Sequence, residues 1–298
     1  MAINPELLRL ELGLSQEEFQ SKYADILKDI ITNQSKPVQD FELKYLITEQ
    51  DIGAEDIIEE VSKKYPVIDG ATYSFTDYYY DLPEDFSLLG QGKALRIRHG
   101  STHYRGEQSR GYKSKRITYK TYEEEGETTY TNRAKQEEIG NSIQIEDYAE
   151  FLTSIDLTEK LENTLTVKGY RRLVTIKVNE QLIDVSFCVA SYQNYINEMP
   201  GCARTIEIRP RDNQIIGRAL LLQIKKELEE AFPQLQSAIT NANIYEIGMV
   251  DTYDKYRKGY IVSEAAEEFE RLHPESTKKL DNIVEDLIQT RNMTYVMK

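Results

Sequence analysis

Apolar and polar residues alternate along much of the chain from about residue 38 onward. Leu43 and Tyr45, for example, alternate with Glu42 and Lys44. Successive side chains of a β-strand point to opposite faces, so a period of two predicts a strand with one apolar and one charged face. Similar patterns predict further strands at 73–81, 93–99, 115–122, 129–138, 165–178, 181–189 and 203–209.

Helical spacing is confined to segments that flank or interrupt these strands. Ser15 and Glu18 form a capping box before apolar residues at helical spacing, which predicts helical structure within residues 1–36. Helices are also predicted at 54–65, 145–155 and 215–231, and in an acidic tail that begins at Ser263 and is broken by Pro274. We therefore expect an α+β protein with an N-terminal helical extension (1–36), a strand-rich domain (37–262) and a C-terminal helical tail (263–298).

Charged residues of both signs recur on one face of the predicted strands. Residues two apart share a face, which pairs Glu42 with Lys44 and Arg96 with Arg98. A solvent-facing sheet shows the same alternation, and for any single strand that is the plainer interpretation. Repeated from strand to strand, the pattern also suits a barrel whose charged face points inward. Such a cavity would suit a polyphosphate with a divalent metal, because cations neutralise phosphate oxygens and carboxylates hold Mg²⁺ or Mn²⁺.

Composition and charge narrow the classes of function. The chain has 298 residues with 37 Lys+Arg and 51 Asp+Glu, and its net charge of −14 argues against broad nucleic-acid binding. No stretch is long and apolar enough for a membrane span, and the acidic start does not look like a signal peptide. Cys188 and Cys202 lack metal-site spacing, and no P-loop or GxGxxG motif is present. A cytoplasmic protein without a membrane partner is expected.

Several segments follow one another in an informative order. DFELKY at 40–45 is an ExExK-like strand, and TDYYYDLPEDFSLLGQGKALRIR at 76–98 combines a Tyr-aromatic-Asp with ALRIR. A strand with Thr118 and Lys120, a basic-then-acidic strand at 133–137, a basic strand at 168–172 and a late Lys255-Tyr256 pair come next. In this order, over about 40–260, the chain resembles the CYTH superfamily, the triphosphate tunnel metalloenzymes.

The resemblance implies a closed eight-stranded antiparallel β-barrel, a tunnel with flanking helices, that binds the triphosphate of its substrate. The implied reaction is a metal-assisted attack on phosphorus, in which positioning and charge neutralisation supply most of the catalysis. The implied ligands of Mg²⁺ or Mn²⁺ are Asp40, Glu42, Glu137, Asp184 and Glu207. The implied substrate-binding cations are Lys44, Arg96, Arg98, Lys120, Arg133, Arg172 and Lys255. The implied catalytic residues are Glu42, Lys44 and Lys255.

Three functions remain open on this basis. The one we favour is a metal-dependent phosphohydrolase that cleaves inorganic triphosphate or a nucleoside triphosphate. The second is a class IV-type adenylyl cyclase that forms cyclic AMP from ATP. The third is a non-catalytic module that binds a triphosphate-bearing small molecule. It is motivated by the strand Thr205-Ile-Glu207-Ile-Arg209, in which one of the two carboxylates that the resemblance implies is missing in either register. The acidic tail is either a solvated helical pair or an oligomer contact, such as that of a homodimer.

Overall fold

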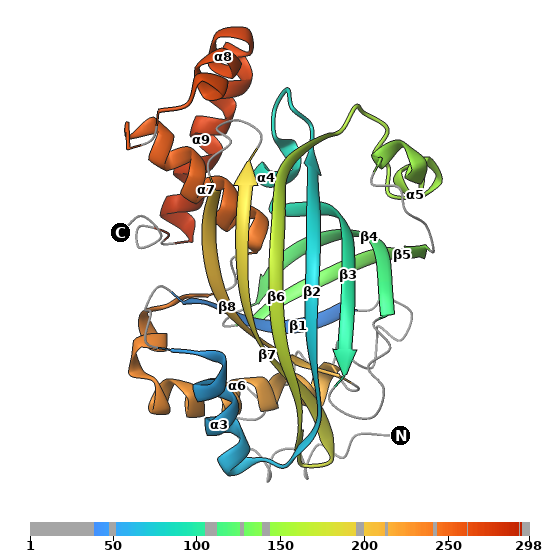
Figure 1. Cartoon of the computed structure of the whole chain (residues 1–298), viewed down its shortest axis with the longest axis vertical. Coiled ribbons are helices and arrows are strands. Elements are labelled where there is room, and N and C mark those ends of the chain that lie inside the picture. The colour runs from blue at the N-terminus through green and yellow to red at the C-terminus, as the bar shows by residue number, and fades with distance from the viewer. Residues whose placement is uncertain are drawn as a thin grey trace.

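In the computed structural model, the described residues are 39–47, 52–104, 112–125, 128–138, 144–194, 200–211, 214–240, 243–260, 262–291 and 293. A single curved sheet dominates this part of the chain (Figure 1). The predicted N-terminal helical extension, 1–36, lies outside the described residues. The strands are β1 (Gln39–Ile47), β2 (Val67–Asp81), β3 (Lys93–Tyr104), β4 (Tyr112–Glu125), β5 (Thr128–Glu138), β6 (Glu162–Val178), β7 (Gln181–Asn194), β8 (Pro200–Pro210) and β9 (Ile239–Thr240).

The strands are ordered β5-β4-β3-β2-β6-β7-β8-β1-β9 in the sheet, and the paired strands run antiparallel. β1 has two long partners, because Gln39–Glu42 pair with β5 and Leu43–Ile47 pair with β8. The expected α+β class is confirmed. The described sheet has nine strands where eight were expected, because the two-residue strand β9 adds to β1. Closure into a barrel stays a prediction.

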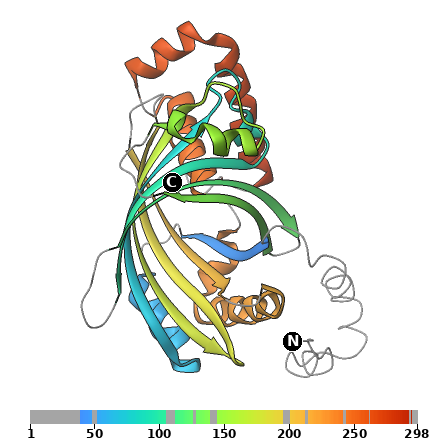
Figure 2. The same ribbon diagram turned by 90° about the vertical axis from the view of Figure 1, so that its right-hand side faces the viewer.

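The face of the sheet that carries Leu43, Ile97 and Ile206 is covered by helices, and we call it the outer face. α3 (Ala54–Lys64) and α6 (Gln214–Ala231) pack there against β1, β6, β7 and β8. The short helices η1 (Ile145–Tyr148) and α5 (Ala149–Ser154) cover β3 and β4 at the other end (Figures 1 and 2). The alternation therefore predicts the apolar, helix-covered face correctly. α4 (Ser87–Gly90) and η2 (Pro233–Ser237) lie in connections.

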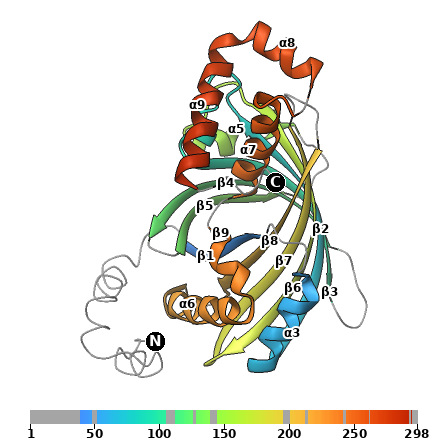
Figure 3. The same ribbon diagram turned by 90° about the vertical axis from the view of Figure 1, so that its left-hand side faces the viewer.

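The opposite, inner face of the sheet is apolar at one end, where helix α7 (Ile244–Arg257) packs on it (Figure 3). Leu46, Tyr79 and Tyr192 of the strands form one cluster with the apolar residues of α7. All residues of Tyr245–Asp254 are buried, because α9 (Pro274–Thr290) contacts α7 as well. A helix enclosed on every side has no apolar stripe, and periodicity therefore did not predict α7.

The C-terminal helices are part of this same core. Pro274 is the first residue of α9, so the predicted break in the tail is confirmed, and α8 (Glu264–Leu272) precedes it. Leu280 and Val284 of α9 belong to the cluster that contains α7 and the inner face of the strands. The division at residue 263 stays a prediction. Within the described residues, no helix is both long and apolar enough to cross a membrane.

Candidate functional site

The inner face changes from apolar to charged along each strand, moving away from α7. On β1, Leu46 belongs to the apolar cluster, whereas Lys44 and Glu42 on the same face do not. On β3, Ala94 is followed by Arg96 and Arg98 in the same way. Strand alternation therefore places charged side chains of neighbouring strands side by side on the inner face, next to the end of that face on which α7 packs. We call them the charged band.

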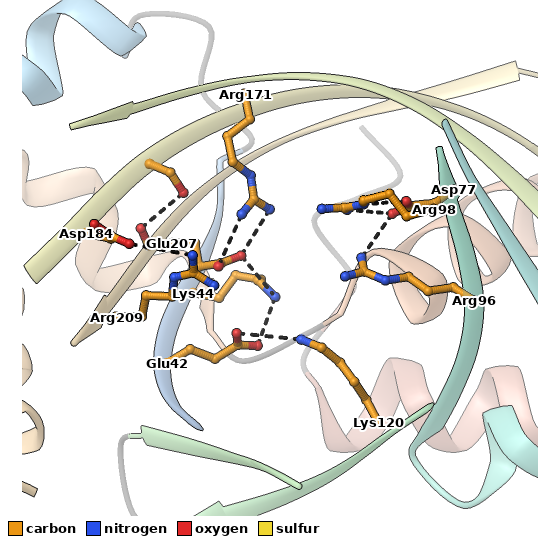
Figure 4. A network of polar contacts seen from close by, with 11 residues as sticks. Glu42, Lys44, Asp77, Arg96, Arg98, Lys120, Arg171, Asp184, Glu207 and Arg209 are labelled. Atoms are coloured by element: carbon orange, nitrogen blue, oxygen red, sulfur yellow. Dashed lines mark hydrogen bonds and ion pairs between the residues drawn. The ribbon is translucent and has the colours of Figure 1, made fainter. Parts of the chain in front are cut away.

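One part of this band joins strands β1, β4, β6 and β8 (Figure 4). Lys44 Nζ lies 3.2 Å from Glu42 Oε1 and 3.8 Å from Glu207 Oε2. Glu207 also accepts two hydrogen bonds from Arg171, at 3.2 and 3.1 Å. Lys120 Nζ lies 3.8 Å from Glu42 Oε2. Three cations therefore surround two carboxylates, and we call these five residues the Glu–Lys group.

The second part of the band joins β2 and β3, on the other side of the view in Figure 4. Asp77 has no exposed surface, and its carboxylate accepts hydrogen bonds from two guanidinium groups. Arg98 donates from Nε at 2.6 Å and from Nη2 at 2.7 Å, and Arg96 donates from Nη1 at 3.0 Å. The Arg98 guanidinium carbon also lies 4.1 Å from the centre of the Phe75 ring. We call Asp77, Arg96 and Arg98 the Asp–Arg group.

The carboxylates of both groups stay ionised, while one lysine is easy to deprotonate. Burial alone would raise the pKa of Glu207, but Arg171 and Lys44 outweigh it and hold that pKa well below its usual value. Glu42 has a lowered pKa for the same reason, because Lys120 and Lys44 oppose the effect of burial. Burial, with help from the charges of Arg96 and Lys44, lowers the pKa of Lys120 to about 8.

The balance of charge in the two groups is positive. Lys44, Arg96, Arg98, Lys120 and Arg171 face Glu42, Asp77 and Glu207, so five cations meet three carboxylates and leave a formal +2 below the pKa of Lys120. A net excess of two positive charges in a largely buried setting is unfavourable unless a bound anion compensates it. The band is therefore suited to bind a polyanion.

A polar donor inside the band adds to this suitability. Thr118 of β4 is opposite Arg96 in the strand register and is 1% exposed. Its Oγ1 makes no hydrogen bond with the described part of the protein. A buried hydroxyl group without a partner is unfavourable, and a bound oxyanion would satisfy it.

Asp184 forms a separate cluster toward the end of the strands remote from α7. Thr175 Oγ1 donates to Asp184 Oδ1 at 2.8 Å, and Arg209 and Arg211 lie 3.5 and 3.7 Å from its carboxylate oxygens. Arg209 is directly opposite Asp184 in the pairing of β7 with β8. Asp184 is therefore neutralised by its own arginines. Among the described residues it belongs to no group of three or more side chains arranged for a metal, and its role as a metal ligand stays a prediction.

Of the twelve residues that the sequence singles out, the described structure brings six together. Arg172 points to the outer face, where it forms an ion pair with Glu55 of α3. Lys255 lies on α7, where it forms an ion pair with Asp251 at 2.6 Å, and no described contact joins it to the band. The side chains of Asp40, Arg133 and Glu137 are outside the described part. The predicted residues that do meet are Glu42, Lys44, Arg96, Arg98, Lys120 and Glu207.

Two residues of the band were not predicted from the sequence. The sequence predicts Arg172 as a substrate-binding cation, but it is its neighbour Arg171 that contacts Glu207 on the inner face. Asp77 lies inside an aromatic run and was considered only as part of a motif. A signal exists for Asp77, because it lies two residues from Phe75 and from Tyr79 and therefore shares their inward face.

Glu42 and Glu207 are the described residues best placed to hold a divalent metal. Both are buried and ionised, and one ammonium group, that of Lys44, lies within 4 Å of each. Among the described residues no group of three or more His, Cys, Asp or Glu side chains is arranged for a metal. Mg²⁺ commonly binds through one or two carboxylates, waters and substrate phosphates, so the pair fits such an ion.

Comparison with protein families gives a direct assignment. The sequence model of the CYTH domain matches residues 39–214, which is more than half of the chain. The chain belongs to the CYTH family. The matched segment contains the Glu–Lys group and the Asp–Arg group, whereas α7, α8 and α9 follow it in the chain. No curated protein matches the CYTH chain significantly.

Three solved structures with a similar fold come from an archaeon, a giant virus and a yeast. The PH1819 protein from Pyrococcus horikoshii OT3 is 19% identical, with 66% of this chain and 89% of that chain covered and a TM-score of 0.39. The RNA triphosphatase domain of a mimivirus mRNA capping enzyme is 10% identical, covering 70% and 96%, with a TM-score of 0.38. The Pct1 RNA triphosphatase of S. pombe is 10% identical, covering 91% of each chain, with a TM-score of 0.29.

Proposed function

We propose that this CYTH protein is a metal-dependent phosphohydrolase that cleaves a phosphoanhydride bond of a triphosphate-bearing small molecule. The observation that carries the proposal is the charged band on the inner face, in which, among the described residues, five largely buried cations contact three buried carboxylates. An excess of buried positive charge is matched to a polyphosphate, and guanidinium groups can bind phosphate oxygens through two hydrogen bonds. Membership of the CYTH family supports the same substrate class.

We also propose that β1–β8 enclose a tunnel around this band. The pairing of β1 with β5 as well as with β8 supports closure, because it joins the two sides of the strand order. An enclosed site lowers the local dielectric constant and strengthens each contact between a cation and a phosphate group. The phosphate chain would lie between the Asp–Arg group and the Glu–Lys group, which face each other in Figure 4.

Within this arrangement, the two groups would have different tasks. Arg96 and Arg98 would hold a phosphate group on one side, and Arg171, Lys44 and Lys120 would hold the neighbouring groups on the other. Glu42 and Glu207 would hold Mg²⁺ or Mn²⁺, which increases the electrophilicity of phosphorus and acidifies bound water. The Lys44 ammonium group lies between the carboxylates of Glu42 and Glu207. When the metal binds these carboxylates, Lys44 would contact phosphate oxygens instead.

Catalysis in this proposal comes from positioning and from neutralising charge. Cleavage of a phosphoanhydride needs an attacking oxygen in line with the bond that breaks, and a stabilised leaving phosphate. Fixed cations on both sides of the phosphate chain restrict its orientation and stabilise charge that develops on the leaving group. Lys120 can also deliver a proton to that group, because its pKa of about 8 is close to neutrality.

The test is release of phosphate from inorganic triphosphate and from ATP with Mg²⁺ or Mn²⁺. We expect Glu42→Gln and Lys44→Ala each to lower kcat/KM by about 100-fold or more, as is typical when a buried charge at the transition state is removed. Exposed residues of α3 provide matched controls, Glu59→Gln and Lys63→Ala, which should keep the wild-type rate. Equal rates in Glu42→Gln and wild type would contradict the proposal.

A binding module is the second candidate, and one observation favours it. Each described carboxylate of the band already contacts a cation, so metal binding competes with these ion pairs. This candidate predicts that triphosphate raises the melting temperature while no product forms from any triphosphate tested. Chromatography of the products from ATP also identifies a cyclase, since cyclic AMP and pyrophosphate would replace phosphate.

A further inference from the structure

Asp77 is the one carboxylate of the band that contacts only arginines among the described residues. It lies on the inner face of β2, directly opposite Arg98 in the register with β3. Both of its oxygens accept from Arg98, and Oδ2 also accepts from Arg96. A single short side chain without exposed surface thus fixes two long ones.

Arg98 is fixed from a second direction as well. Phe75, two residues before Asp77 on the same face, places its ring 4.1 Å from the guanidinium carbon. The bidentate contact with Asp77 uses the Nε and Nη2 edge, and the ring covers one surface of the plane. An arginine side chain that is free in solvent otherwise loses much rotamer entropy when it binds a ligand. In this structure much of that freedom is already removed.

We propose that Asp77 is a positioning residue, which orients Arg96 and Arg98 so that both bind one phosphate group of the triphosphate. The inference rests on the proposed function, because it takes the inner face as the triphosphate site. Burial alone would raise the pKa of Asp77, but the charges of Arg98 and Arg96 outweigh burial and hold that pKa below its usual value. The carboxylate therefore stays ionised, as this role requires.

A second role for the same carboxylate makes the opposite prediction. If Asp77 served only to neutralise charge, its removal would leave the band more positive and would increase affinity for a polyanion. If it orients the arginines, its removal releases two guanidinium groups and decreases that affinity. The direction of the change in affinity therefore separates the two roles.

The experiment measures binding of inorganic triphosphate by isothermal titration calorimetry in EDTA at pH 7, where no turnover takes place. For Asp77→Asn we expect a Kd at least about tenfold above wild type, since small misplacements of binding groups have effects of this size. Asp77→Glu keeps the charge but moves the carboxylate by one methylene, and it should also weaken binding. Asp254→Asn is the control, because Asp254 is buried on α7 in an ion pair with Lys258.

The possible results are distinguishable. A merely structural role would lower the melting temperature and the fraction of protein that binds, whereas the Kd of that fraction would equal wild type. Asp77→Asn binding as tightly as wild type, or more tightly, would overturn the inference, as would unchanged affinity in Asp77→Glu. If the wild-type protein binds no triphosphate, the proposed function fails, and the inference fails with it.

Discussion

Lys120 shows how a single residue can make the site sensitive to pH. Its side chain is only 12% exposed beside Arg96 and Lys44, and its pKa is lowered to about 8, whereas arginine side chains keep their charge throughout the physiological range. Near pH 7 the ammonium group is charged and contacts Glu42. Above pH 8 most molecules would lose that charge, and the band would lose one of its five cations.

We therefore expect affinity for triphosphate to fall as pH rises from 7 to 9. The protonated fraction of Lys120 falls from about 0.9 to about 0.1 over this interval, given a pKa near 8. Calorimetric Kd values measured at several pH values would show the decrease, and Lys120→Arg should flatten it because arginine stays charged. An equally steep profile in Lys120→Arg would contradict this assignment. Lys63→Arg on the outer helix α3 is the matched control.

Arg171 and Arg172 show the limit of sequence reasoning at the scale of residues. Two adjacent cations on one strand must point to opposite faces, but alternation alone does not say which face is inward. The choice is made by tertiary contacts, because Glu55 of α3 pairs with Arg172 and Glu207 of β8 pairs with Arg171. On β1, β3 and β4 apolar residues mark the outer face, so alternation alone assigns Lys44, Arg96 and Lys120 to the opposite face.

At the scale of elements, α7 is fixed to the sheet by buried polar contacts. Asp81 at the end of β2 accepts from the backbone of α4 at Leu88 and Leu89, both at 2.9 Å. Its Oδ2 also accepts from the Tyr245 hydroxyl at 2.9 Å, and that hydroxyl lies 2.8 Å from Thr164 Oγ1. The Tyr245 ring stacks on Tyr79, with centroids 5.1 Å apart. One side chain of α7 therefore contacts both β2 and β6, and Asp81 links that contact to α4.

We expect Tyr245→Phe to lower the free energy of unfolding by about 1–3 kcal/mol, because it removes the hydroxyl and leaves buried polar groups with fewer partners. Chemical denaturation followed by circular dichroism provides the measurement. Tyr260→Phe is the control, because Tyr260 is 72% exposed and its substitution should have almost no effect. Similar unfolding curves for the two variants would show that the hydroxyl does not stabilise α7.

The elements that the sequence predicted well are those with a regular pattern. Helix α3 was expected at 54–65 and spans Ala54–Lys64, and the expected strands are confirmed with shifted ends. α7 was missed because it is buried on all sides, so that its apolar residues do not follow a helical stripe. Hydrophobic periodicity detects a helix that buries one face. α7 is instead buried between the sheet and α9, which only the tertiary structure shows.

At the scale of the molecule, the C-terminal helices and the sheet share one core. Leu280 of α9 has no exposed surface and belongs to the same cluster as Leu165 of β6 and Met249 of α7. A helical tail that is independent of the sheet would not need such contacts. The helices after Ser263 are therefore expected to unfold together with the strands.

Leu280→Ala tests this coupling. The substitution should lower the stability of the whole chain by about 2–5 kcal/mol, the usual cost of a cavity in a core, and one cooperative thermal transition should persist. Differential scanning calorimetry would record both quantities. Leu272→Ala, at the end of α8, is the control because Leu272 is 53% exposed. A second transition that moves alone, with the main one unchanged, would mean that the tail folds separately.

The position of α7 has a consequence for biosynthesis. β8 ends at Pro210, whereas α7 begins only at Ile244 and ends at Arg257. At about 5–20 residues per second, a ribosome needs roughly 2–10 seconds to add this stretch after completing β8. During that time Leu165 and Tyr192 have been made but lack the helix that covers them. Until α7 is made, the nascent chain exposes this inner apolar surface, and we expect it to aggregate more readily at that stage than after α7 has packed.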